Sequence, residues 1–315
     1  MIEIKNITKR YGDKLAVDDV SFNINDGEIL GFLGRNGAGK TTTMNIVTGY
    51  ISSNAGSVKL DGIDILENPR EFKRQIGYLP EQPPLYMEMT VKDYLHFVCD
   101  IKGVLRNKQT GHIDDIIDLV KIGDVYGRMI KNLSKGYKQR VGLAQALVGN
   151  PKVVIMDEPT VGLDPRQIID IRRLIKELGK HHTVVLSSHI LPEVADVCER
   201  VVIINKGKIV ASDLLSNLTS GMNEAAHLSI RIHGDEKQTL KILKSVPGVT
   251  YAQSMGVKEA DSCDFIVESS SRTDVRRPLF VALAKAGRPI IMLKPMEFTL
   301  EDIFLRVTAE KEEIE

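Results

Sequence analysis

Apolar residues are spaced along the first part of the chain as they are in β-strands. Val20–Ile24 alternates between apolar and polar residues, and Ile29–Leu33 is a short apolar run with the length of a buried strand. Asp61-Gly62 separates Val58–Leu60 from Ile63–Ile65, and Asp-Gly supplies the positive φ angles that a tight hairpin turn requires. We therefore predict short buried strands and a hairpin before any long helix.

Helical spacing begins near Val91, where apolar residues recur every three or four positions. Beyond Val148 the pattern alternates between strand and helix: Val153–Met156 (strand), Pro165–Leu178 (helix), Thr183–Ser187 (strand), Leu191–Cys198 (helix) and Arg200–Ile204 (strand). Strands that alternate with helices of this length are typical of a mainly parallel sheet with covered faces.

A polar stretch rich in Ser and Asn, Asp213–Asn223, marks a predicted domain boundary. We expect one domain over residues 1–220, with a helical subdomain at about 83–150, and a second over 224–315. The second domain is expected to contain Leu228–Ile232 (strand), Glu236–Val246 (helix), Thr250–Gln253 and Phe265–Glu268 (strands), Arg272–Ala286 (helix) and Ile290–Leu293 (strand). This βαββαβ order is ferredoxin-like, and a last helix is expected at Leu300–Thr308.

Composition limits the kinds of protein this can be. A chain of 315 residues is long enough for two folding units. Lys plus Arg equals Asp plus Glu, at 42 each, so the bulk charge predicts no nucleic-acid partner. Cys99, Cys198 and Cys263 lack the spacing of a disulfide framework or a zinc site, which favours the cytosol. No signal peptide and no apolar run of about 18 residues is seen, so the chain itself is not expected to cross a membrane.

A phosphate-binding loop stands between a predicted strand and a predicted helix. The segment Gly34–Thr41 fits the pattern GxxxxGK[ST] in full, and Thr42 follows it. The residues predicted to surround the phosphates are Gly34, Arg35, Asn36, Gly37, Ala38, Gly39, Lys40, Thr41 and Thr42. Glycines let backbone N–H groups turn toward an anion, and the helix N-terminus adds its positive dipole end. Lys40 is expected to reach the β- and γ-phosphates, and the Thr41 hydroxyl to bind Mg²⁺.

Two acids end the apolar strand Val153–Met156. A buried strand would deliver Asp157 beside the phosphate loop, where its carboxylate can hold Mg²⁺ through water. Glu158 is one residue further and points differently, so it can act on an attacking water. The alternative is that the two acids simply end a strand at the solvent-exposed surface. The phosphate loop upstream makes this alternative the less favoured one.

Five further elements narrow the family. They are the signature-like Leu133–Arg140 (LSKGYKQR), the loop glutamine Gln82, Gly162-Leu163-Asp164, the histidine of Ser187-Ser188-His189, and Tyr11 after Lys9-Arg10. Each is weak alone, but all stand in one order over the first 215 or so residues. With the phosphate loop they resemble the ATP-binding cassette (ABC) family.

The resemblance implies an α/β P-loop cassette with a mainly parallel core sheet, an antiparallel β subdomain and a helical subdomain. It also implies an ATPase that uses ATP and Mg²⁺ and dimerises around two ATP. Ser134 and Gly136 of one subunit would face the γ-phosphate held by Lys40 of the other, and Asp164 would link the two sites. Tyr11 would stack on adenine, Glu158 would activate water and His189 would stabilise the γ-phosphate. Gln82 would contact Mg²⁺ or water.

The signature and the phosphate loop each depart from the family pattern. Lys135 replaces a glycine of the signature and Tyr137 replaces its glutamine, while Arg35 stands where proline is frequent. Ser134 and Gly136 are kept. We therefore expect a working ATPase, without an expectation for its rate.

The sub-class is suggested by Leu133–Leu147, Tyr78–Tyr86 and Thr299–Phe304, which resemble ATPases of gliding-motility and related multidrug or export systems. In that group a homodimer or heterodimer of ATPase subunits drives a separate membrane permease from the inner face of the membrane, here expected in the export direction. The permease is expected to contact Pro83–Tyr94, through Leu85, Tyr86, Met87 and Met89.

Other functions stay open. A non-transport cassette ATPase of translation or DNA repair usually has two cassettes or long coiled coils, and this chain has one phosphate loop and no sustained heptads. A cassette that binds without hydrolysing is disfavoured by the presence of Glu158 and His189. For the C-terminal domain, a structural or dimerisation role is favoured over a regulatory or permease-binding one.

Overall fold

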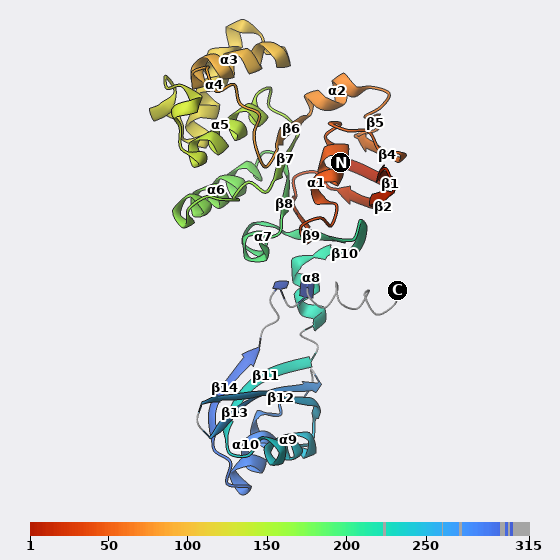
Figure 1. The fold of residues 1–315 in the computed structure, drawn as a ribbon, viewed down its shortest axis with the longest axis vertical. Helices are drawn as coiled ribbons and strands as arrows, with labels where there is room; N and C mark the ends of the chain where they lie inside the picture. The colour runs from red at the N-terminus through yellow and green to blue at the C-terminus, as the bar shows by residue number, and fades with distance from the viewer. Residues whose placement is uncertain (223–224, 260, 271–272, 297–299, 302, 305–315) are drawn as a thin grey trace. The chain divides into compact units, whose positions relative to one another are not determined.

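The structure is a computed structural model that describes residues 1–222, 225–259, 261–270, 273–296, 300–301 and 303–304. These residues fall into two compact units, of which the first is Met1–Leu215 and the second begins at Ser216 (Figure 1). Within the described part of the chain, no helix combines the length and the apolar character needed to cross a membrane.

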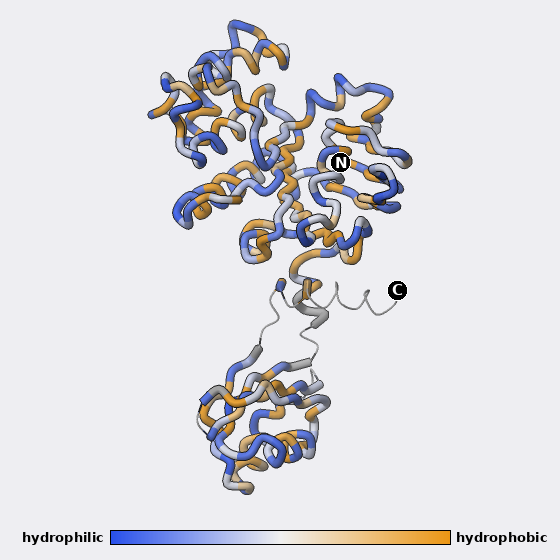
Figure 2. The backbone as a smooth tube through the Cα atoms, in the orientation of Figure 1, coloured by the Kyte–Doolittle hydropathy of each residue, from blue (hydrophilic) through white to orange (hydrophobic). Residues whose placement is uncertain are grey.

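A six-stranded sheet forms the centre of the first unit, in the order β10-β9-β3-β8-β7-β6. Its strands are β3 (Ile29–Leu33), β6 (Ile76–Leu79), β7 (Val153–Asp157), β8 (Thr183–Ser188), β9 (Arg200–Asn205) and β10 (Lys208–Leu214). All neighbours are parallel except β10 with β9. Strands β3, β7 and β8 are buried at every residue, and apolar colour runs through this centre in Figure 2. The mainly parallel sheet predicted from the apolar runs is confirmed.

An antiparallel sheet in the order β2-β1-β4-β5 lies in the same unit. Its strands are β1 (Ile2–Tyr11), β2 (Lys14–Ile24), β4 (Ala55–Leu60) and β5 (Ile63–Asp64). Helix α1 (Lys40–Val47) shares a hydrophobic core with strands of both sheets. The predicted hairpin is present, with positive φ at both Asp61 (49°) and Gly62 (85°).

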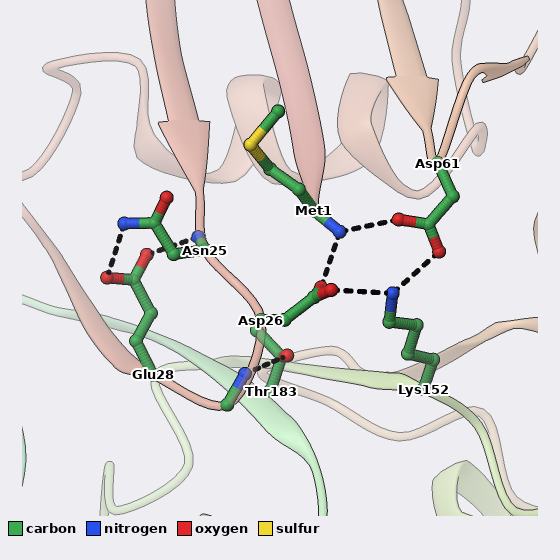
Figure 3. A network of polar contacts seen from close by, with 8 residues as sticks. Met1, Asn25, Asp26, Glu28, Asp61, Lys152 and Thr183 are labelled. Carbon is green, nitrogen blue, oxygen red and sulfur yellow. Dashed lines mark hydrogen bonds and ion pairs between the residues drawn. The ribbon is translucent and has the colours of Figure 1, made fainter.

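Exposed charges connect this antiparallel sheet to the loop before β7 (Figure 3). The Lys152 ammonium lies 2.9 Å from Asp26 Oδ2 and 2.6 Å from Asp61 Oδ2, and the Met1 amine contacts both acids. These cations lower the pKa of both carboxyl groups, and the two acids raise the pKa of Lys152. Electrostatic attraction between exposed groups therefore holds this network together.

Helices between β6 and β7 form the helical part of the first unit. They are α3 (Val91–Lys102), α4 (Arg106–Val120) and α5 (Lys135–Leu147), with 3-10 turns at Gly123–Val125 and Ile130–Asn132, and α2 (Pro69–Arg74) precedes β6. Lys102 Nζ donates to the carbonyls of Ala146 (3.2 Å) and Val148 (2.8 Å), so α3 caps the end of α5. Burial lowers the pKa of Lys102 to about 8.

Helix α5 begins at Lys135, whereas the sequence predicted that it begins four residues later, at Gln139. Ser134 is its N-cap residue, with a side chain that accepts from the Tyr137 N–H at 3.4 Å, so the signature residues belong to the first turn. Helices α6 (Pro165–Leu178) and α7 (Leu191–Val197) follow β7 and β8. Asp164 caps α6 by accepting from the N–H groups of Arg166 and Gln167, both at 3.0 Å.

The second unit has the ferredoxin-like element order. After α8 (Leu215–Met222) come β11 (Ala225–His233), α9 (Glu236–Ser245), β12 (Val249–Glu259), β13 (Ser262–Ser270), α10 (Arg276–Lys285) and β14 (Ile290–Met296). They form an antiparallel sheet in the order β12-β13-β11-β14 over a separate apolar core. Much of the predicted Leu300–Thr308 helix lies outside the described residues. The predicted boundary stretch contains the end of β10 and helix α8.

Candidate active site

Three neighbouring parallel strands bring the predicted site residues to one edge of the central sheet. Strand β8 pairs with β3 on one side and with β7 on the other. Their carboxyl ends lead into the loop that begins at Gly34, into His189, and into Asp157 and Glu158. Ligands bind at such carboxyl edges in open α/β sheets, so the topology alone assembles a candidate site.

The loop after β3 bends sharply into α1. Gly39 has φ 111°, and a Cβ there would lie 2.7 Å from the Ala16 carbonyl oxygen, so a side chain would be excluded by both strain and space. The first turn of α1 contains no acidic residue, and its N-cap residue makes no side-chain cap hydrogen bond. The start of α1 therefore presents backbone N–H groups that suit an anion.

Glu158 contacts both Lys40 and His189 directly. Lys40 Nζ donates to the Gly34 carbonyl at 2.9 Å and lies 3.4 Å from Glu158 Oε1. The other carboxylate oxygen of Glu158 is 2.8 Å from His189 Nδ1. The side chains of Lys40 and Glu158 are 6% and 7% exposed, whereas that of His189 is 39% exposed. The group is thus a buried cation and carboxylate with a histidine at the solvent side.

The backbone at Glu158 explains where its carboxylate points. Its φ is 49°, in the left-handed region that non-glycine residues seldom adopt. Its N–H donates to the Ser187 carbonyl at 2.9 Å, and its own carbonyl accepts from the Val161 N–H at 3.2 Å. These bonds hold a turn that directs Glu158 away from the line of β7, and such held strain is frequent at functional sites.

Asp157 is a buried carboxylate at the end of β7. Its exposed fraction is 1%, and among the described residues neither carboxylate oxygen has a partner in hydrogen-bonding geometry. Burial raises the pKa of Asp157 and the charge of Glu158 adds to the rise, while Ser187, Thr41 and Lys40 oppose it. A buried carboxylate in this state suits a bound cation.

Two pockets collect most of the predicted residues. The first, of about 610 Å³, is lined by these predicted residues: Tyr11, Asn36, Gly37, Gly39, Lys40, Thr41, Thr42, Glu158 and His189. Lys9 Nζ lies 5.5 Å from the centre of the Tyr11 ring. The second, of about 580 Å³, is lined by Thr41, Gln82 and Asp157 among others. The two pockets share Thr41, so the predicted phosphate and metal residues are contiguous.

Other predicted residues lie outside these two pockets. Ser134, Gly136 and Asp164 line neither, and nor does exposed Arg35. Lys135 extends over Gly162, where an added Cβ would lie 2.1 Å from its Nζ, and the Tyr137 hydroxyl donates to Asp124 Oδ2 at 2.6 Å. The chain alone therefore keeps the signature residues apart from its own phosphate loop.

Some lining residues were not predicted. Lys14 is paired with Tyr11 across the β1–β2 turn, and Ala16, Glu81 and Val161 also line the first pocket. Lys14 could have been inferred from the short Gly12-Asp13 turn after Tyr11, but the other three carry no motif.

Comparison with known proteins gives one consistent result. The family model described as ABC transporter matches residues 17–161. The ABC transporter ATP-binding protein YhcH of Bacillus subtilis (strain 168) is 32% identical over 320 residues, covering 100% of this chain and 98% of that protein. The bacitracin transport ATP-binding protein BcrA of Bacillus licheniformis is 38% identical over 212 residues, covering 67% of this chain and 68% of that one.

A solved structure gives the same result for the first unit. The dimeric post-hydrolysis state of the ATP-binding cassette MJ0796, bound to ADP and Pi, superposes with a TM-score of 0.62 and 26% identity. The match covers 68% of this chain and 99% of that one. The cassette likeness therefore covers about two thirds of the chain, while the YhcH alignment covers all of it.

Proposed function

The chain belongs to the ABC transporter family as an ATP-binding and ATP-hydrolysing subunit, and on that premise we propose which of its residues bind and cleave ATP. The observation that carries the assignment is the contact of Glu158 with both Lys40 and His189 at the carboxyl edge of the sheet. Lys40 is more than a hundred residues away from the other two along the chain, and each of the three side chains follows a different one of the neighbouring strands β3, β7 and β8.

We propose that the triphosphate binds the loop Gly34–Thr42 and the start of α1. Lys40 would exchange its contact with Glu158 for the β- and γ-phosphates, since an ammonium close to a carboxylate is already placed for an anion. Tyr11 lines the same pocket and is 49% exposed, which leaves a ring face for adenine. Arg35 is an exposed residue of this loop and adds a cation near the phosphates.

The residues present fit a Mg²⁺ ion. Asp157, Thr41 and Gln82 line one pocket, and the Asp157 carboxylate lacks a hydrogen-bond partner among the described residues. Carboxylate and hydroxyl oxygens are ligands that Mg²⁺ accepts. When bound, the ion would neutralise phosphate charge. The chain's own contribution is to hold Asp157 at the end of β7, next to the start of α1.

Hydrolysis is assigned to Glu158 and His189. Glu158 is placed to orient a water and accept its proton, and its rigid turn limits the positions its carboxylate can take. His189 holds one oxygen of Glu158 through Nδ1 and leaves its other ring nitrogen for the γ-phosphate. In this arrangement His189 fixes the catalytic carboxylate as well as the substrate.

Family ATPases dimerise, and we propose that a second subunit completes the site. Ser134 and Lys135 are exposed and, with Gly136, stand at the start of α5, whose first turn contains no acid. That helix end would face the γ-phosphate of the partner's ATP. Asp164 would link the two sites from the start of α6. A homodimer is the simplest arrangement, and a heterodimer with a related ATPase would use the same contacts.

Family ATPases also work with membrane permeases, and we propose Pro83–Tyr94 as the docking segment. Tyr86 is 56% exposed, yet its ring is held edge-on to Phe97 at 5.4 Å and lies 6.0 Å from Tyr94. Met87 is also exposed, whereas Leu85 is buried and packs inside. An anchored, exposed aromatic side chain suits a helix in a groove. The chain would then sit at the inner face of the membrane, and the resemblance of Leu133–Leu147 and Tyr78–Tyr86 to export ATPases favours export.

A pull-down from detergent-solubilised membranes tests this proposal. The tagged chain should bring down a multi-span membrane protein at about a one-to-one ratio. Tyr86→Ala should lower that recovery severalfold while ATP hydrolysis by the free subunit stays unchanged. Tyr251→Ala, at an exposed tyrosine of the second unit, is the matched control. Recovery with ribosomes or DNA would instead support a non-transport cassette.

A further inference from the structure

A second link between the Glu158 and His189 segments lies behind the candidate active site. The Thr160 hydroxyl donates to Glu193 Oε2, and both residues are 3% exposed. Thr160 is two residues after Glu158, and Glu193 is four residues after His189. Side chains therefore join the two segments twice, once through Glu158 and His189 at the pocket and once through this buried pair.

Glu193 also faces the helix that follows the Gly162-Leu163-Asp164 loop. Its Oε1 lies 3.7 Å from Arg172 on α6, and the other end of that guanidinium lies 3.7 Å from exposed Asp196. The Arg172 Nε has no hydrogen-bond partner among the described residues. Glu193 therefore connects three pieces of chain: the turn after β7, helix α6 and helix α7.

Helix α7 itself is pressed against the sheet. Val194 is fully buried, and a Cβ added to Gly31 of β3 would lie 2.4 Å from Val194 Cγ1. Close packing on β3 sets the distance of α7 from the sheet, but apolar contacts permit sliding along it. A hydrogen bond from Thr160 to Glu193 has direction as well as distance, so it can fix the register of α7. His189 stands two residues before α7, so the position of α7 limits where its side chain can lie.

Burying the Glu193 carboxylate costs free energy, which indicates that Glu193 does more than fill space. A carboxylate that is 3% exposed loses most of its hydration, and one hydroxyl with an arginine at 3.7 Å replaces it incompletely. An apolar residue at position 193 would fill the same space without that loss. Buried polar pairs of this kind can fix one arrangement among several of similar packing energy.

We propose that Thr160 and Glu193 are positioning residues that hold His189 against Glu158. Neither side chain contacts the reacting atoms; they act through the placement of α7. The inference rests on the roles proposed above for Glu158 and His189. It predicts that ATP turnover depends on the Thr160 hydroxyl even though this group lines neither pocket.

Steady-state ATP hydrolysis by four variants tests the proposal. Thr160→Val keeps the shape and removes the donor, and should lower kcat about tenfold because small misplacements of catalytic groups are costly. The KM for ATP should change by less than about twofold, since Lys40 and the phosphate loop are untouched. Thr160→Ser should restore kcat, and Glu193→Gln, which keeps an acceptor for Thr160, should give an intermediate value. Asp196→Asn, at the exposed acid beside Arg172, is the matched control and should behave as wild type.

A second readout does not depend on turnover. The imidazole ¹⁵N resonances of His189, assigned with His189→Ala, report the bond from Nδ1 to Glu158. Thr160→Val should shift them, and Thr160→Ser should leave them in place. Wild-type kcat in Thr160→Val would overturn the proposal. So would equal losses in Thr160→Val and Thr160→Ser with a lower unfolding temperature and unmoved His189 resonances, because that is the result of a purely structural role.

The same assay separates this inference from the roles on which it rests. If Glu158→Gln and His189→Ala keep wild-type turnover, the catalytic roles are wrong. If both lose turnover while Thr160→Val does not, those roles stand and the positioning role alone is wrong.

Discussion

Two helix starts in the first unit, those of α1 and α5, resemble each other in sequence chemistry and differ in their surroundings. Neither has an acidic residue in its first turn, and both have a lysine as the first helical residue. Lys40 of α1 is buried against Glu158, whereas Lys135 of α5 is exposed and extends over Gly162. The start of α6 is different again, because Asp164 already caps it with a carboxylate.

In the dimer proposed above, one chain would hold two unlike halves of a site. At α1 the counter-charges belong to the same chain, so this half is assembled in the monomer. At α5 a cation stands at the positive end of a helix dipole, which is locally unfavourable by about 0.3–1 kcal/mol. An anion bound at this helix end, such as the phosphate of a nucleotide held by another subunit, would make the position of the Lys135 charge favourable. The α1 half is therefore expected to govern binding and cleavage within a chain, and the α5 half to govern association.

The largest expected effect is at Glu158. Glu158→Gln should lower ATP turnover about 100-fold or more, because the proton acceptor is lost. The contacts to phosphate remain, so ATP should hold this variant as a dimer, measurable by light scattering. Lys40→Ala is the contrasting control: it should weaken ATP binding itself, by about 2–5 kcal/mol, and give no dimer. Wild-type turnover in Glu158→Gln would contradict the role assigned to this residue.

Asp157 gives the next effect, on stability. Its pKa is raised, so the folded state binds this proton more tightly than the unfolded chain does. Stability from this group is therefore present at low pH and is lost as pH rises from the unfolded pKa of about 3.9 through the folded value. Asp157→Asn removes the buried charge and should raise the free energy of unfolding of the nucleotide-free protein by about 1–3 kcal/mol at pH 7.

Denaturant unfolding with and without Mg²⁺ and ATP measures this effect. The advantage of Asp157→Asn should shrink near pH 4, and the variant should gain little stability from Mg²⁺ added with ATP. A variant less stable than wild type at pH 7 would show that the Asp157 carboxylate is satisfied in the folded protein.

The same region shows what the sequence can and cannot predict. The P-loop motif identified Lys40, and the acid pair after an apolar run identified Glu158, because each has a local pattern. Their contact is not local: it follows from β3, β8 and β7 being neighbours, which depends on pairing across the whole unit. Thr160 and Glu193 were not predicted at all, since a lone threonine and a lone helical glutamate have no distinguishing pattern.

Secondary structure shows the same limit. Helix α6 has the predicted bounds because Asp164 caps it and Pro165 suits its first position. The start of α5 was placed too late, because Ser134, Lys135 and Gly136 resemble a loop until the cap is seen. Strand β1 went unpredicted, and its pairing with β2 is interrupted by register shifts that break the alternation.

Lys135 tests the α5 half directly. Lys135→Ala should weaken ATP-dependent dimerisation about fivefold, since an exposed charge near a phosphate contributes on the order of 1 kcal/mol. ATP binding to the monomer should not change, and the unfolding temperature should hold or rise slightly as the unfavourable dipole contact is removed. Lys138→Ala, one turn along the same helix, is the matched control. Sedimentation of the variants in the Glu158→Gln background measures the dimer. If Lys135→Ala also weakened the binding of ATP to the monomer, the α5 start would not act on association alone.

The smallest effect is expected where the charges are densest at the surface, at Lys152. Its side chain and those of Asp26 and Asp61 are 35–55% exposed, so water and salt screen their attraction. Because the pKa values of both acids are lowered, their stabilising effect is present above the unfolded pKa of about 3.9 and is lost as pH falls further. Lys152→Met should therefore lower the free energy of unfolding at pH 7 by about 1 kcal/mol or less, and the loss should shrink in 1 M salt. Lys59→Met on β4 is the matched control. A loss above about 2 kcal/mol that persists in high salt would show that the network holds the β4–β5 hairpin to the loop before β7 by more than surface charge.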